Sequence, residues 1–105
     1  MTKVEINPGV CGFIANVTAD TTDDDMIALK IQSGCAGITK LAERLGEEVD
    51  PYEICFGKPG TGEAYEIAQE VCPAHVGCPV IAGILKCIEA EAKLALPRNA
   101  EIRFL

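Results

Sequence analysis

Two stretches of alternating apolar and polar residues, separated by an acidic turn, constrain the fold of this chain most strongly. Positions 13, 15, 17 and 19 are apolar in the first stretch, and Ile27, Leu29 and Ile31 are the corresponding positions in the second. A period of two is typical of a β-strand that buries one face. The polar run 20–25 predicts the turn, so we expect an antiparallel hairpin.

The register of this hairpin follows from where its turn is centred. If the centre lies near residue 23, Val17 lies opposite Leu29 and inward side chains meet across the pair. The same register, extended, sets Cys11 beside Cys35, and opposed residues lie about 4.5–5.5 Å apart at Cα. We therefore expect two thiols at one end of the hairpin.

The rest of the chain alternates between helical and extended patterns. Apolar residues recur at helical spacing in 35–45, 63–71 and 79–96, which predicts three helices. Short alternating runs predict further strands at residues 4–6, 52–56 and 100–105. This order predicts an α+β fold, a two-layer domain with a mostly antiparallel sheet and three helices on one face.

Length and charge restrict the classes of function. The 105 residues suit a single α+β domain, residues 1–105, with an aliphatic core. The formal charge is −7, and the lysines and arginines are scattered singly. This pattern disfavours nucleic-acid binding and attachment to an anionic membrane surface. The aliphatic composition is compatible with a homodimer, and no protein partner is indicated.

The N-terminus indicates the compartment. Residues 1–5 lack the apolar region of a signal peptide, and no apolar run approaches ~18 residues. We therefore expect a cytoplasmic protein. Because that compartment is reducing, the six cysteines suit metal ligation, redox chemistry or burial better than structural disulfides.

The densest group of reactive residues is the segment 72–79, with the sequence Cys-Pro-Ala-His-Val-Gly-Cys-Pro. Cys72, the sole histidine His75 and Cys78 have the short spacing of metal ligands. If this segment reaches the end of the sheet where Cys11 and Cys35 meet, four thiolates converge. Four thiolates are the ligand set of a tetrahedral zinc ion or an iron–sulfur cluster. We expect Cys11, Cys35, Cys72 and Cys78 as ligands, with His75 as an alternative.

Two other interpretations stay open. Cys35 and Cys78 lie at the N-termini of predicted helices, where the helix dipole favours a thiolate. One alternative is therefore a thiol–disulfide redox protein, in which Cys72 and Cys78, or Cys11 and Cys35, cycle between dithiol and disulfide. The other is a non-enzymatic interaction domain whose cysteines only pack, as we expect for Cys55 and Cys87. Whether the chain is an enzyme is left undecided, since no third group orients a Cys–His pair.

Several segments together resemble a known family. They are Pro8–Phe13, Ser33–Cys35, Cys72-Pro73, Gly83–Lys86 and Leu94–Pro97. The chain resembles, over nearly its whole length, an uncharacterised family of small cysteine-containing proteins from anaerobic bacteria and archaea. That family has no established activity, so the resemblance implies no catalytic residues. An anaerobic setting would favour an iron–sulfur or thiol role.

Overall fold

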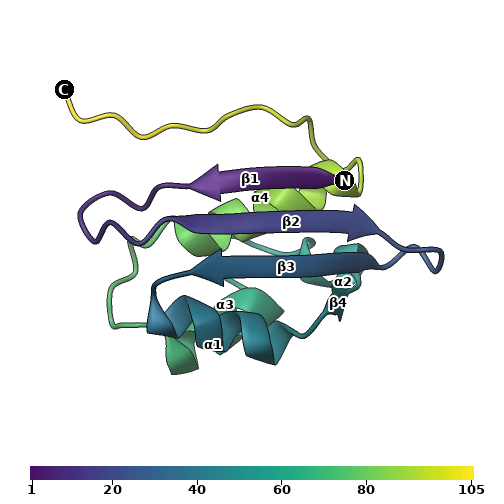
Figure 1. Ribbon diagram of the computed structural model, residues 1–105, viewed down its shortest axis with the longest axis horizontal. Coiled ribbons are helices and arrows are strands. Elements are labelled where there is room, and N and C mark those ends of the chain that lie inside the picture. Colours follow the sequence, from purple (N-terminus) through teal and green to yellow (C-terminus); the bar gives the residue numbers. More distant parts are fainter.

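The predicted hairpin forms the centre of a four-stranded antiparallel sheet in the computed structural model, which describes residues 1–105 (Figure 1). The strands lie in the order of the chain, and each pairs with the next. Their bounds are β1 Thr2–Ile6, β2 Ala15–Thr21, β3 Ile27–Ser33 and β4 Glu48–Val49. Since β4 has only two residues, β1 is the long open edge of the sheet.

The hairpin has the predicted faces but not the predicted register. Val17 lies opposite Ile31 rather than Leu29, a shift of two residues that keeps inward side chains on the inward face. The cause is the turn, in which Thr22 N–H donates to Met26 O and Asp25 takes a positive φ of 60°. The turn is therefore centred one residue later than predicted.

Three helices appear where the helical spacing predicts them. They are α1 Ala36–Leu45, α3 Glu63–Val71 and α4 Val80–Glu91. The last ends earlier than the predicted residue 96. Lys93 has a φ of 62°, and Leu94 N–H donates to Glu89 O, a pattern that terminates a helix in a left-handed residue. The apolar positions beyond Glu91 thus lie outside the helix.

The two remaining short strands were wrongly predicted. Residues 52–56 are not a strand, because α2 Pro51–Ile54 forms there. Pro51 occupies its first turn, and Asp50 accepts from Tyr52 N–H at 2.9 Å, the features that start a helix. Residues 100–105 are extended but pair with no strand. With α2 included, four helices rather than three accompany the sheet.

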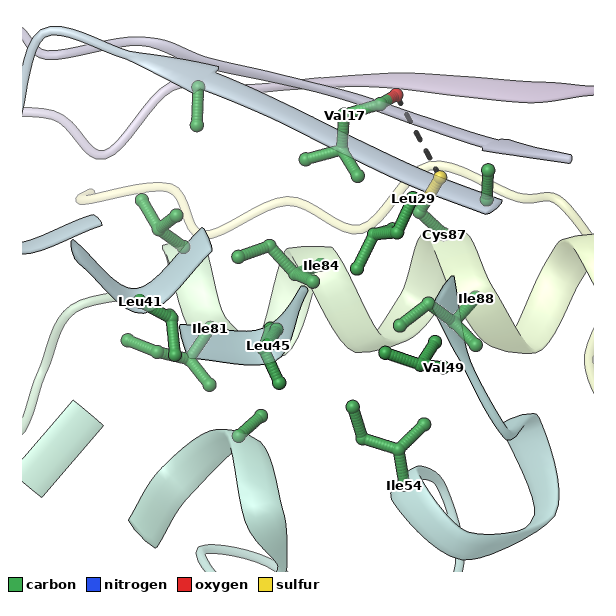
Figure 2. Close-up of a cluster of buried hydrophobic side chains, with 14 of the residues drawn as sticks. Val17, Leu29, Leu41, Leu45, Val49, Ile54, Ile81, Ile84, Cys87 and Ile88 are labelled. Carbon is green, nitrogen blue, oxygen red and sulfur yellow. Dashed lines mark hydrogen bonds between the residues drawn. The ribbon is translucent and has the colours of Figure 1, made fainter. Parts of the chain in front are cut away.

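The core lies between the inward face of the sheet and the helices, and Figure 2 shows its side chains there. Helix α4 packs on β1 and β2, whereas α1 packs on β3 and on α3. Ile84 and Ile88 of α4 are fully buried, and each contributes about 1.5–3 kcal/mol by leaving water. The α+β fold expected from the sequence is confirmed. None of the helices has the length and apolar character needed to cross a membrane.

Candidate thiol site

Three connections meet at one end of the molecule, on the left in Figure 1. They are the β1–β2 loop, the start of α1 and the connection between α3 and α4. The contact between the last two is close. A Cβ added to Gly37 would lie 3.0 Å from Cys72 Cα and 2.9 Å from Pro73 Cδ. The segment 72–79 therefore reaches the Cys35 end of the sheet, as the sequence hypothesis requires.

Cys35 precedes α1 and is held by its backbone. Its N–H donates to Ser33 Oγ at 3.1 Å, and its carbonyl accepts from Thr39 N–H at 3.0 Å. The hydroxyl of Thr39 donates to the carbonyls of Ser33 and Cys35. No side chain caps the helix, so the sulfur of Cys35 is not used as a cap acceptor. The half-buried thiol is free for other chemistry.

Cys72 and Cys78 border the connection between two helices. Cys72 ends α3, where its N–H donates to Ala68 O at 2.9 Å. Cys78 stands directly before Pro79, the N-cap residue of α4. Both side chains are half-buried, whereas His75 between them is exposed. The His75 backbone N–H donates to Pro73 O at 2.8 Å, which closes the loop locally.

Cys35, Cys72 and Cys78 are all half-buried and pack against the same core. Burial is the main cause that raises the pKa of Cys72, and the negative charges of Cys35 and Cys78 raise that pKa further. Charges act on a pKa in this way only over short distances in a protein. Cys35, Cys72 and Cys78 thus form one group, which we call the thiol cluster.

Cys11 lies outside this cluster. It is exposed in the β1–β2 loop, ahead of the first residue of β2 rather than paired with Cys35. The loop still joins the same end of the molecule, because the ring of Phe13 lies 3.0 Å from the Cβ position of Gly34. No three His, Cys, Asp or Glu side chains are arranged to hold a metal ion. The metal site of Cys11, Cys35, Cys72, Cys78 and His75 therefore stays a prediction.

The other two cysteines have separate surroundings. Cys87 is fully buried, and its thiol lies 3.6 Å from Thr2 O and 3.8 Å from Val17 O (Figure 2). Burial, and then the charge of Glu91, raises the pKa of Cys87 to about 11. This confirms the expected packing role. Cys55 is half-buried at the end of α2, and burial followed by the charge of Glu89 raises its pKa to about 11.

A pocket of about 260 Å³ lies beside Cys55. Residues 57–61 of the glycine-rich connection form one wall, and Lys86 and Glu89 of α4 form part of the other. Within that connection, Thr61 N–H donates to Lys58 O at 3.0 Å. The connection is therefore a turn closed on itself, as its glycine and proline content favours.

Glu91 is a buried-face residue that the sequence analysis missed. A glutamate in a helix ordinarily lies on the solvated face, yet this side chain is only 10% exposed. It accepts from Thr2 Oγ1 at 2.7 Å and from Thr21 N and Oγ1 at 3.0 and 2.9 Å. The bond from Thr2 is the largest cause that lowers the pKa of Glu91 to about 2. Its position three residues after buried Ile88 was the available signal.

Comparison with known proteins places the chain in one family. No curated protein and no solved structure matches it. A family model does match, over residues 2–104, and it describes a family of unknown function, DUF6951. Because this match covers nearly every residue, the chain belongs to the DUF6951 family of unknown function.

Proposed function

We propose that this protein binds one thiophilic metal, a zinc ion or an iron–sulfur cluster, through Cys35, Cys72 and Cys78. The observation that carries the proposal is the close packing of Cys72 against the start of α1, which brings the 72–79 connection to the Cys35 end of the sheet. Thiolates that gather at one point repel each other unless a cation lies between them. A metal ion removes that repulsion and deprotonates its thiol ligands outright.

The fourth ligand comes from one of the two loops at this end. Cys11 in the β1–β2 loop completes a four-thiolate set, and His75 in the 72–79 connection is the alternative. Both residues are exposed outside helices and strands. Their side chains can therefore turn toward the cluster without breaking the hydrogen bonds of the sheet. Such a move, with smaller rotations of the three cluster thiols, would bring the ligands to bonding distance.

We propose that the protein is cytoplasmic and that the family functions in anaerobic cells. Both settings keep thiols reduced, and an oxygen-free setting preserves iron–sulfur clusters. The raised pKa of Cys72 adds a condition, since its proton must leave before sulfur binds metal. Metal affinity should accordingly rise with pH through the neutral range.

Titration of the reduced protein with Zn²⁺ or Co²⁺, without oxygen, tests the proposal. We expect one metal per chain, with thiolate-to-cobalt absorption bands in the Co²⁺ form. If roughly 10–16 kcal/mol of zinc binding is shared by four ligands, each thiolate contributes about 3 kcal/mol, or roughly a hundredfold in Kd. Cys35→Ser, Cys72→Ser and Cys78→Ser should each weaken binding by that factor.

Cys55→Ser is the matched control, because Cys55 is half-buried like the cluster thiols but stands apart from them. This variant should bind metal as the wild type does. Reconstitution with iron and sulfide, followed by visible absorption, distinguishes a cluster from zinc. A reduced, folded protein that takes up neither metal contradicts the proposal, as does equal loss of binding in Cys55→Ser.

A thiol–disulfide exchange protein is the second candidate, and the surroundings of Cys72 favour it. Cys35 and Cys78 lie at the same end of the molecule as Cys72, and either is a candidate for the bridge. Oxidised glutathione would take up the two electrons and two protons that the pair gives up. Because a raised pKa lowers the thiolate fraction of Cys72, the partner thiol would attack first. Peptide mass spectrometry that finds six free thiols after this oxidation excludes the candidate.

A further inference from the structure

The last eight residues, 98–105, form an extended segment that has no partner, and we call this segment the tail. From Asn99 onward, none of its backbone groups makes a hydrogen bond within the chain. The side chains of Ile102, Phe104 and Leu105 are 79%, 98% and 114% exposed. An apolar extended segment with free backbone groups is the kind of chain that adds to the edge of a sheet.

The same molecule has an open sheet edge. Strand β1 pairs with β2 on one side and with nothing on the other. Its inward residues Val4 and Ile6 touch the core but stay half-buried, because no strand covers their outer flank. Lys3 and Glu5 point to the solvent face. The edge therefore offers free backbone groups next to an incompletely covered apolar strip.

The tail has the alternation that this edge requires. Ala100, Ile102 and Phe104 fall on one face of an extended chain, and Glu101 and Arg103 fall on the other. The family model reaches residue 104, so the tail is part of the domain that the family shares. The tail therefore belongs to the domain, and its exposed apolar side chains need a place in the fold or in an assembly.

The direction of the tail separates pairing within one chain from pairing between two. Figure 1 shows that the tail starts beside the N-terminal end of β1, runs in the same direction and ends beyond the strand. Pairing in place would be parallel and would leave the apolar end of the tail past β1. Antiparallel pairing in one chain would first require the tail to run past β1. Passing β1 would use about five residues of the tail, at ~3.3 Å each. Too few residues would then remain to turn back and pair with the strand.

We infer that two copies of this chain exchange tails, the tail of each copy pairing antiparallel with β1 of the other. In such an exchange the free backbone groups of β1 and of the tail bond to each other in both copies. The two equivalent contacts are related by a twofold axis, so the assembly stops at a dimer. One register sets Phe104 opposite Val4 and Ile102 opposite Ile6, so apolar side chains meet on the inward face. It also sets Arg103 opposite Glu5 on the solvent face, and opposed charges stabilise a cross-strand pair.

The mass of the protein in solution, measured by light scattering over a range of concentrations, gives the first test. We expect about twice the 11.1 kDa of one chain. Removal of residues 98–105 should give a folded monomer, since no tail residue packs against the core and none from Asn99 onward makes a backbone hydrogen bond. A wild type that is monomeric throughout overturns the inference, whether or not its own tail protects β1 in hydrogen exchange. A truncated protein that remains dimeric overturns it too.

Charge reversal gives a sharper test, because it can be repaired only between chains. Glu5→Arg and Arg103→Glu each place like charges opposite one another at both symmetric contacts, which should raise the dimer Kd about tenfold. An equal mixture of the two variants restores an opposite-charge pair at both contacts and should recover the wild-type Kd. Lys30→Glu reverses a charge on the same sheet face, on β3, and should change nothing. A mixture that is no tighter than either variant alone contradicts the exchange.

Discussion

The two ends of α4 present cysteines in opposite circumstances. Near its C-terminal end, Cys87 lies in the core with carbonyl acceptors in reach, and Glu91 is held by three hydrogen-bond donations. Before its N-terminal end, Cys78 stands in the connection that also holds Cys72 and that packs against the start of α1 beside Cys35. The side chains at the C-terminal end of α4 therefore have hydrogen-bond partners within the chain, whereas the thiols at the N-terminal end lack such partners.

This difference shows why a raised pKa alone does not identify a functional thiol. Burial is the main cause at both Cys72 and Cys87. The second cause separates them, because it is other thiols at Cys72 but the carboxylate of Glu91 at Cys87. A carboxylate beside a buried thiol keeps it protonated and inert, whereas neighbouring thiols supply further ligands or a disulfide partner. The identity of the neighbour therefore decides the chemistry.

The largest expected contrast is in thiol labelling of the native, reduced protein. Cys11 is exposed and should react with a small alkylating reagent at the rate of free cysteine in a short peptide. Cys87 is fully buried, so its reaction requires opening of the core, and we expect at least a ~1,000-fold slower rate. Mass spectrometry of timed samples measures both rates. Rapid labelling of Cys87 would remove the distinction between the two ends.

A methyl group at Gly37 should disturb only the thiol-cluster end. In Gly37→Ala the new Cβ meets the backbone of residues 71–72 and the ring of Pro73 at 2.9–3.1 Å. Such overpacking costs about 1–3 kcal/mol of unfolding free energy, and we also expect weaker metal binding because segment 72–79 is displaced. Denaturant unfolding and metal titration measure the two effects.

Gly77→Ala is the control for this change, since a Cβ there meets nothing within 4 Å. It lies in the same connection, and it should leave both quantities near the wild-type values. If the two alanine variants behave alike, the close approach of α1 to Cys72 has no energetic weight.

Acid should weaken the other end of α4. Unfolded Glu91 takes up a proton near the ordinary glutamate pKa of 4.5, whereas in the folded protein Thr2, and then Thr21, lower the pKa to about 2. The stabilisation is therefore complete above about pH 5 and is lost as pH falls toward 2. With allowance for solvent screening, we expect a loss of about 1–2 kcal/mol. Urea unfolding from pH 6 to 2 should show this slope in the wild type and a smaller one in Glu91→Gln.

The smallest expected difference concerns alanine at single cysteines. Cys87→Ala removes a fully buried sulfur and should lower stability by about 1 kcal/mol. Cys72→Ala, at a half-buried thiol in metal-free protein, should change stability by less than about 0.5 kcal/mol. Thermal unfolding of both variants checks the order. The reverse order would show that the thiol cluster, rather than Cys87, is part of the packed core.

Sequence patterns predicted the faces of the sheet because they depend only on a period of two. The register depended instead on which of three adjacent aspartates takes the left-handed conformation, and the pattern does not single out Asp25. At residues 51–54 the sequence contains a helix-start signal, but the prediction gave more weight to the alternating pattern of residues 52–56. Asp50-Pro51 is a helix start, whereas alternation over so few residues fits a strand or a helix.

The candidate site was predictable in part for a similar reason. The hypothesis required segment 72–79 to reach the Cys35 end of the sheet, and the close contact at Gly37 agrees. The exposed position of Cys11 was not predictable, because it depends on where β2 begins. Glu91 was missed because a charged residue is not expected on the apolar stripe of a helix, whereas here Thr2 and Thr21 satisfy its carboxylate.

The left-handed residue at the end of α4 has a consequence for how the molecule could assemble. If Lys93 were helical, the helix would continue through Leu96 and carry the chain about 7 Å farther along its axis, at 1.5 Å per residue. The tail would then leave the body at a different point and angle from the end of β1. The left-handed conformation of Lys93 thus sets how far the tail reaches. A β-branched residue at this position would change the direction of the tail while leaving every residue of the proposed interface unchanged.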